Sequence, residues 1–246
     1  MTDDAALVAA AAANNAHWCD VVCRAHGAAT AFGEDFWICA TKAPPLYPNL
    51  VTLAGPEPLR IAAQLDAVEG LRSLDLPPNW AVKDSFRSLD LTANGYELLF
   101  DAVWIAREPV ASPGLASADV VFVRDAAGLA EWEAAWRREE SEADALPTRL
   151  FRDLLLASSE VGFVALRRGG RIVAGAAVNR AAGVAGMTNL FTGSEDAAAV
   201  AFAIANAIAL RYPGLTIVDY ESAERALELR SAGFRTIGPL AVWLAS

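Results

Sequence analysis

The chain is poor in the residues that most often carry metal or nucleophilic chemistry. It has two histidines, His17 and His26, and three cysteines, Cys19, Cys23 and Cys39, in 246 residues. Because both imidazoles fall in one expected helix, a Ser-His-Asp triad is not predicted. Cys19 and Cys23 stand one helical turn apart beside the histidines, a spacing compatible with zinc. The odd cysteine count and the lack of a second pair favour small buried apolar residues instead, so no metal is predicted.

The loops that identify several large enzyme classes are also absent. The sequence contains no Gly-x-Ser-x-Gly elbow, no phosphate-binding Walker loop, no dinucleotide-binding glycine triplet and no His-Glu-x-x-His. These absences argue against serine hydrolases of the elbow type, P-loop nucleotidases, classical dehydrogenases and the commonest zinc proteases.

Positive charge is in short supply as well. Lys and Arg number 20 against 30 Asp and Glu, a net charge of -10. Such a surface repels phosphate backbones and anionic lipid, so neither nucleic acid nor membrane is an expected partner, whereas an amine-bearing ligand suits it. The Ala-rich opening run follows Asp3 and Asp4 rather than basic residues and is too short to span a bilayer. With reduced thiols and no export signal, a cytoplasmic protein is expected.

What the sequence does have is an internal echo. Three landmarks occur twice in the same order, about 135 to 140 residues apart, and suggest a duplicated unit. They are NLVTLAGPE (49–57) with NLFTGSE (189–195), VKD (82–84) with IVD (217–219), and GYELLFDAVWI (95–105) with GFRTIGPLAVWL (233–244). The alternative is that strands of any α/β protein look alike, with Trp104 and Trp243 as ordinary core residues.

The boundary between the two copies lies in a stretch rich in Pro, Gly, Ser and Ala at 109–118, which has the composition of a linker. We therefore predict a mixed α/β fold in two units, at 1–110 and 119–246, with the first unit abbreviated.

The second copy shows alternating strand and helix patterns. The Gly169-Gly170 pair predicts a tight hairpin turn, and Ser194 is expected to cap a long apolar helix. Predicted strands are 119–124, 161–166, 171–179, 184–192, 215–220 and 237–244, and predicted helices follow Asp125 and cover 148–157, 195–211 and 223–231.

This order of elements resembles the GCN5-related N-acetyltransferase (GNAT) superfamily. The resemblance rests on the Gly-Gly hairpin, the strand–loop–helix at 187–211 and the terminal helix, Gly-Phe and strand at 223–244, and it covers all of 119–246. It implies a mixed sheet that splays open, with acetyl-CoA in the split. The first unit looks like a shortened copy, with a loop and helix at 55–72 and a front hairpin near 29–40.

The resemblance also implies where the coenzyme binds. The backbone of 187–192 would hold the pantetheine, and the loop at 193–199 would hold the diphosphate at a helix N-terminus. The implied binding residues are Leu190, Phe191, Thr192, Gly193, Ser194, Ala197 and Ala199. The loop departs from the family's pattern because its usual cation is missing and Glu195 and Asp196 occupy the first helical turn. In the first unit, Gly55-Pro56-Glu57-Pro58 is no better a phosphate site, since its prolines lack N–H donors.

A second departure concerns the general acid. Many family members carry a Tyr four residues before the Gly of the last Gly-Phe pair, and Leu229 stands there in this sequence. Tyr220 is the expected substitute, with Glu221 or Asp219 as a base acting through water. The alternative interpretation makes Tyr220 a rim aromatic and the two carboxylates caps of the next helix.

Two functions follow. The first is an acyl-CoA-dependent N-acyltransferase, with acetyl-CoA as the expected cosubstrate and a small amine as acceptor. The second is a non-catalytic relative whose diphosphate loop has decayed. The sequence leaves the acceptor open, and also whether the chain forms a homodimer.

Overall fold

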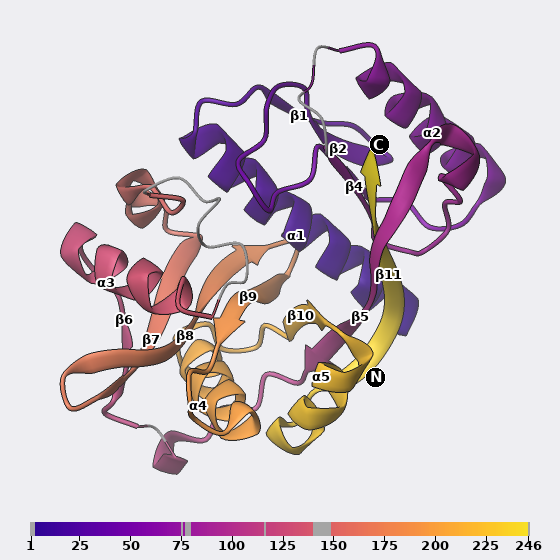
Figure 1. Ribbon diagram of the computed structural model, residues 1–246. Helices are drawn as coiled ribbons and strands as arrows, with labels where there is room; N and C mark the ends of the chain where they lie inside the picture. Colours follow the sequence, from indigo (N-terminus) through magenta and orange to yellow (C-terminus); the bar gives the residue numbers. More distant parts are fainter. Residues whose placement is uncertain (1–2, 75, 77–79, 116, 140–148, 246) are drawn as a thin grey trace. The chain divides into compact units, whose positions relative to one another are not determined.

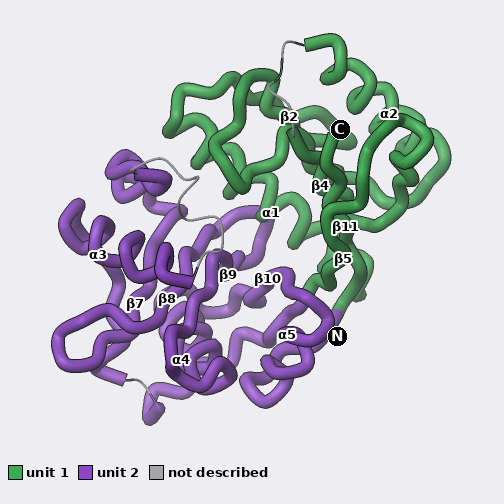
Figure 2. Tube along the Cα trace, in the orientation of Figure 1, with its two compact units in different colours: residues 1–104, 237–246 green, residues 105–236 purple. Residues whose placement is uncertain are grey.

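The computed structural model describes residues 3–74, 76, 80–115, 117–139 and 149–245, in two compact units (Figures 1 and 2). Unit 1 joins Met1–Trp104 to Ile237–Ser246, and unit 2 is Ile105–Thr236. Strands β5 (Tyr96–Arg107) and β11 (Arg235–Ala245) each contribute residues to both units. The compact units divide the chain differently from the predicted domains, 1–110 and 119–246, since they assign most of the C-terminal strand to unit 1. The division into those two domains stays a prediction.

Unit 1 is a mixed sheet with two long helices. Its strand order is β1-β2-β3-β4-β11, antiparallel except where β3 runs parallel to β4. Helix α1 begins after Asp3, whose carboxylate accepts the Ala5 N–H at 3.2 Å. The elements are α1 (Asp4–Ala25), β1 (Thr30–Phe32), β2 (Phe36–Cys39), β3 (Leu50–Thr52), α2 (Pro58–Arg72), β4 (Ala81–Asp84) and the 3-10 turn η1 (Thr92–Asn94), followed by β5.

The three cysteines lie in one apolar cluster of unit 1. Cys19, Cys23 and Cys39 are free and buried, and they pack with Ala16, Trp37 and Val51. Burial raises the pKa of the Cys19 thiol to about 11. Within the described ranges, no group of three or more His, Cys, Asp or Glu side chains is arranged to hold a metal ion.

In unit 2 the strands of the mixed sheet follow the order β10-β9-β8-β7-β6. Neighbouring strands are antiparallel except β9 and β10, which are parallel. The elements are η2 (Pro113–Leu115), β6 (Val120–Phe122), α3 (Ala126–Trp136), η4 (Asp153–Ala157), β7 (Val161–Arg168), β8 (Arg171–Ala181), β9 (Val184–Phe191), α4 (Ala197–Arg211), β10 (Ile217–Glu221), α5 (Ala223–Glu228) and η5 (Leu229–Ala232).

An aromatic cluster forms the centre of unit 2. Trp132 of α3 is fully buried, and its ring meets those of Phe151, Phe163 and Phe191 edge-on at centroid distances of 5.0–5.3 Å. Its indole N–H donates to the Val164 carbonyl at 2.9 Å. The tryptophan therefore joins α3 to two strands, β7 and β9, and satisfies its polar atom inside the core.

The repeated sequence landmarks correspond to two β-α-β crossovers of equal length. In unit 1, β3, α2 and β4 bring Leu50 opposite Val82, and in unit 2, β9, α4 and β10 bring Ala185 opposite Ile217. Both partner pairs are 32 residues apart, and the two crossovers are offset by 135 residues. Descent of both units from one duplicated ancestor remains a prediction, which this equality supports.

Two local predictions were wrong. The helix expected at 148–157 is a 3-10 turn over Asp153–Ala157, and residue 148 lies outside the described residues. The long helix begins at Ala197 rather than Glu195, and its N-cap is Asp196 rather than Ser194. Separately, none of the described helices is long and apolar enough to cross a bilayer.

Candidate functional site

The predicted coenzyme strand separates from its parallel neighbour. The ladder between β9 and β10 covers only Ala185 with Ile217 and Gly186 with Val218. Both strands continue beyond it, β9 to Phe191 and β10 to Glu221. The later parts of the two strands therefore leave main-chain groups outside this ladder. That the backbone of 187–192 holds the pantetheine stays a prediction.

A bulge shapes the separated part of β9. Gly175 of β8 pairs with Phe191 and Ala177 with Thr188, so β9 holds one extra residue at this point. Asn189, inside the bulge, has a positive φ of 54°. Leu190 is half-buried, whereas Phe191 is buried against Trp132. Of these two predicted binding residues, Phe191 is thus limited to contact through its backbone.

The predicted diphosphate loop already holds an anion, a carboxylate of the chain itself. The Thr192 N–H donates to Oε2 of Glu139 at 3.2 Å, and the Gly193 N–H donates to Oε1 of the same residue. Gly193 has φ +57°, and a Cβ there would lie 2.6 Å from the Val173 carbonyl oxygen. Only glycine fits this backbone, and it aims two adjacent N–H groups at one carboxylate.

The rest of the loop is acidic, as the sequence indicated. The N–H of Ala199, one of the predicted binding residues, donates to the Asp196 carboxylate at 2.8 Å. Asp196 thereby caps the helix. The Glu195 carboxylate lies 3.9 Å from the Arg168 guanidinium. Ser194 is exposed, and Ala197 is the first residue of α4. The carboxylates at this helix N-terminus oppose a bound diphosphate, because they interact with the same end of the helix dipole.

A cation that sequence reasoning missed reaches the loop from α5. Nη2 of Arg225 lies 3.5 Å from the Thr192 hydroxyl, and Nη1 pairs with Glu228 at 2.9 Å. The loop's own sequence lacks a basic residue, so the positive charge comes from 33 residues further along the chain. No short-range pattern signals that placement.

The three predicted catalytic residues follow one another at the end of β10. Asp219 is buried, and its carboxylate accepts the Tyr220 N–H at 2.8 Å. Tyr220 and Glu221 are half-buried. Burial raises the pKa of Glu221 to about 7, with Arg225 opposing the shift and Glu228 adding to it. A carboxyl group with this pKa changes charge near neutral pH, as a general base requires.

Glu221 also makes stability depend on pH. Its pKa rises from the ordinary 4.5 to about 7 on folding, so the folded state binds this proton more tightly than the unfolded state. The stabilisation from the bound proton is complete below pH 4.5 and is lost as pH rises through 7. At pH 8 we expect the free energy of unfolding of Glu221→Gln to exceed that of the wild type by up to about 3 kcal/mol, which a higher urea midpoint would show. Near pH 4.5 the two proteins should have the same midpoint. Equal urea midpoints at both pH values would contradict the burial of this carboxyl.

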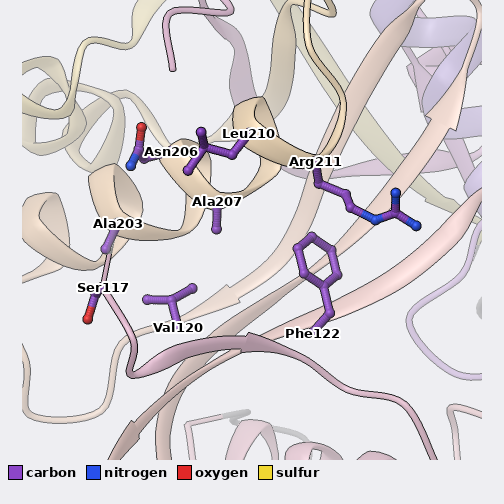
Figure 3. A pocket seen from close by; sticks show the side chains of 8 residues that line it. All are labelled: Ser117, Val120, Phe122, Ala203, Asn206, Ala207, Leu210 and Arg211. Atoms are coloured by element: carbon purple, nitrogen blue, oxygen red, sulfur yellow. The ribbon is translucent and has the colours of Figure 1, made fainter. Parts of the chain in front are cut away.

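Unit 2 has a hollow of about 290 Å³ between β6 and α4, away from the predicted site (Figure 3). Val120 and Phe122 of β6 face Ala203 and Ala207 of α4, and the Arg211 side chain lies beside the Phe122 ring. It shares no residue with the loop or with Asp219–Glu221, so it does not bear on the predicted site.

The arrangement of these elements defines the class of fold. The antiparallel strands β6 to β9, the parallel partner β10 that separates from β9, and the helix between them form the fold of the GCN5-related N-acetyltransferase superfamily. The mixed α/β fold predicted from the sequence is therefore confirmed.

Particular solved structures share this fold over nearly the whole chain. A GCN5-related N-acetyltransferase from Kribbella flavida matches with a TM-score of 0.59 and 15% identity, covering 95% of each chain. A protein of the GNAT family from Novosphingobium aromaticivorans matches with 0.55 and 14%, covering 92% of this chain and 94% of that one. A functionally unknown conserved protein from Staphylococcus epidermidis matches with 0.55 and 9%, covering 89% and 94%. No protein-family model and no curated protein matches the sequence.

Proposed function

We propose that the protein is an acyl-CoA-dependent N-acyltransferase that acts on a small amine, with acetyl-CoA as the cosubstrate. The observation that carries this proposal is the separation of β9 from β10 next to a carboxyl group, Glu221, whose pKa is raised to about 7. The fold supports it at the level of fold analogy. The net charge of -10 favours an amine over an anionic acceptor.

The loop fits an anionic group in one respect. Two backbone N–H groups, of Thr192 and Gly193, converge on the carboxylate of Glu139, which stands in for a phosphate oxygen. Arg225 adds a cation beside Thr192. The diphosphate would take these N–H groups when Glu139 withdraws from them.

Side chains of this protein would accept and donate the protons of the reaction. The bound coenzyme supplies an activated acyl group as a thioester. Glu221, ionised above pH 7, would accept a proton from the acceptor nitrogen, directly or through water, so that a neutral amine attacks the thioester carbonyl. Tyr220 would provide a proton for the departing thiolate, and the buried Asp219 would fix the backbone at Tyr220 through its hydrogen bond.

A second candidate function is favoured by the same Glu139 contact. A carboxylate that permanently satisfies the Thr192 and Gly193 N–H groups would leave a GNAT fold without coenzyme binding. Leu229 in place of the family's usual Tyr, and the capping carboxylate of Asp196, point the same way. The protein would then be a binding module with no transferase activity.

Acetyl-CoA binding separates the two candidates. At a concentration of one hundred times its dissociation constant, a ligand that binds only the folded protein stabilises it by about 2.7 kcal/mol. We expect a clear rise in Tm with acetyl-CoA. Glu139→Gln should bind it about tenfold more tightly, because it removes a negative charge and leaves only one oxygen to compete for the two N–H groups. Isothermal titration calorimetry measures both affinities.

Glu131→Gln is the matched control for that variant. Glu131 lies on α3, which ends three residues before Glu139, and it also accepts a backbone N–H, from Ile172 at 3.3 Å, but it does not contact the loop. Its substitution should leave the acetyl-CoA affinity unchanged. If neither the wild type nor Glu139→Gln binds millimolar acetyl-CoA, the transferase proposal fails and the binding module is favoured.

A further inference from the structure

A buried arginine of unit 2 has one guanidinium nitrogen without a hydrogen-bond partner among the described residues. Arg107 ends β5 and is 7% exposed. Its Nε–H donates to the Ala232 carbonyl at 3.0 Å, and its guanidinium carbon lies 5.3 Å from the centre of the Phe202 ring. Nη1 is buried and has no hydrogen-bond partner among the described residues. No described Asp or Glu forms an ion pair with it.

This situation is unfavourable unless something complements the charge. A buried cation without an acceptor loses its hydration without recovering it through hydrogen bonds. Burial accordingly lowers the pKa of Arg107 from its ordinary value. Arginine stays charged in proteins, so the guanidinium still requires an anion or another acceptor.

The same arginine lines a cavity. A hollow of about 240 Å³ is bordered by Arg107 at the end of β5, by Glu108 and Val110 after it, by Phe202 of α4, and by the segment Ser231–Gly233. Gly233 has φ +90°, a backbone conformation that favours glycine, and the Arg107 side chain lies beside it. None of these residues belongs to the 190–199 loop or to Asp219–Glu221.

We propose that this cavity binds a small organic carboxylate, which accepts hydrogen bonds from the Arg107 guanidinium. A guanidinium N–H donates a charge-assisted hydrogen bond to a carboxylate oxygen. The walls at Val110 and Phe202 are apolar and suit a short alkyl or aromatic group on the ligand. A single buried positive charge matches a monoanion, and Glu108 on the same wall disfavours a phosphate dianion.

Titration with benzoate tests the proposal. In the full-length protein, we expect saturable binding by calorimetry and a rise in Tm with benzoate concentration. Arg107→Met should weaken benzoate binding by about tenfold or more, the usual consequence of losing a charge-assisted hydrogen bond. Without ligand, its Tm should be equal to or above that of the wild type, because an unpaired buried charge has been removed.

Arg211→Met is the matched control. Arg211 is also an arginine of unit 2 with its guanidinium over an aromatic ring, 5.5 Å from the centre of Tyr212, but it lines the other hollow. Its substitution should leave benzoate affinity unchanged. Val110→Trp gives an independent variant that keeps Arg107, and it should abolish binding by filling the cavity. Val110 is 64% exposed, so this change should leave the fold intact.

Several outcomes would overturn the assignment. Absence of saturable benzoate binding to the wild type would do so, as would equal affinity in wild type, Arg107→Met and Val110→Trp. Binding of inorganic phosphate that depends on Arg107, with no response to benzoate, would overturn the carboxylate class. If Arg107→Met fails to fold, the Val110→Trp result alone decides the question.

Discussion

Replacing Glu221 with Gln is expected to lower kcat/KM for acetyl transfer by about a hundredfold or more. The amide keeps the size of the side chain but cannot accept a proton at any accessible pH. The wild-type rate should increase as pH rises through about 7, where Glu221 loses its proton, and Gln should remove that rise. Release of free thiol from acetyl-CoA in the presence of a panel of primary amines measures both effects.

Glu224→Gln serves as the control for this experiment. Glu224 is exposed in the first turn of α5, three residues beyond Glu221. Its removal changes the local charge by the same amount and should leave the rate and its pH profile unchanged. An unaltered pH profile in Glu221→Gln would show that another group is the base.

Replacing Trp132 with Ala is expected to destabilise the protein by about 3–5 kcal/mol. The indole ring fills the space among Phe151, Phe163 and Phe191, and its N–H satisfies the Val164 carbonyl. Its removal leaves a cavity in a core that cannot collapse easily, and it also leaves a buried carbonyl without its donor. The midpoint of urea unfolding, followed by circular dichroism, measures the loss.

Leu154→Ala provides the comparison. Leu154 belongs to η4 of the same unit and is 68% exposed, so its truncation should change the free energy of unfolding by no more than about 0.5 kcal/mol. A loss below about 1 kcal/mol for Trp132→Ala would mean that the aromatic cluster is not the centre of the unit 2 core.

The fold was largely predictable because its main signals are local. Gly169-Gly170 specifies the β7–β8 turn, and both glycines have positive φ. The equal spacing of the two crossovers was visible as an offset between short sequence landmarks. The start of α4 was misplaced because Ser194, Glu195 and Asp196 follow one another, and each residue can begin or precede a helix. Only the hydrogen bond from Ala199 to Asp196 decides among them.

The candidate site was less predictable because its charges come from distant parts of the chain. Glu139 lies 53 residues before Thr192, and Arg225 lies 33 residues after it. Their contacts depend on how α3 and α5 pack on the sheet, which no pattern of hydrophobic spacing encodes. The raised pKa of Glu221 likewise results from burial, a tertiary property, whereas its place at the end of a strand was readable from the sequence.

The assignment of the C-terminal strand to unit 1 has a consequence for how the protein matures on the ribosome. Ala241 and Trp243 of β11 belong to the buried cluster that also holds Leu50, Val82 and Tyr96. The nascent N-terminal half must therefore wait, with an unfilled edge on β4, until more than a hundred further residues have been translated. During that interval the half-built sheet is open to mispairing and to chaperones, whereas unit 2 has every segment it needs as soon as residue 236 has been translated.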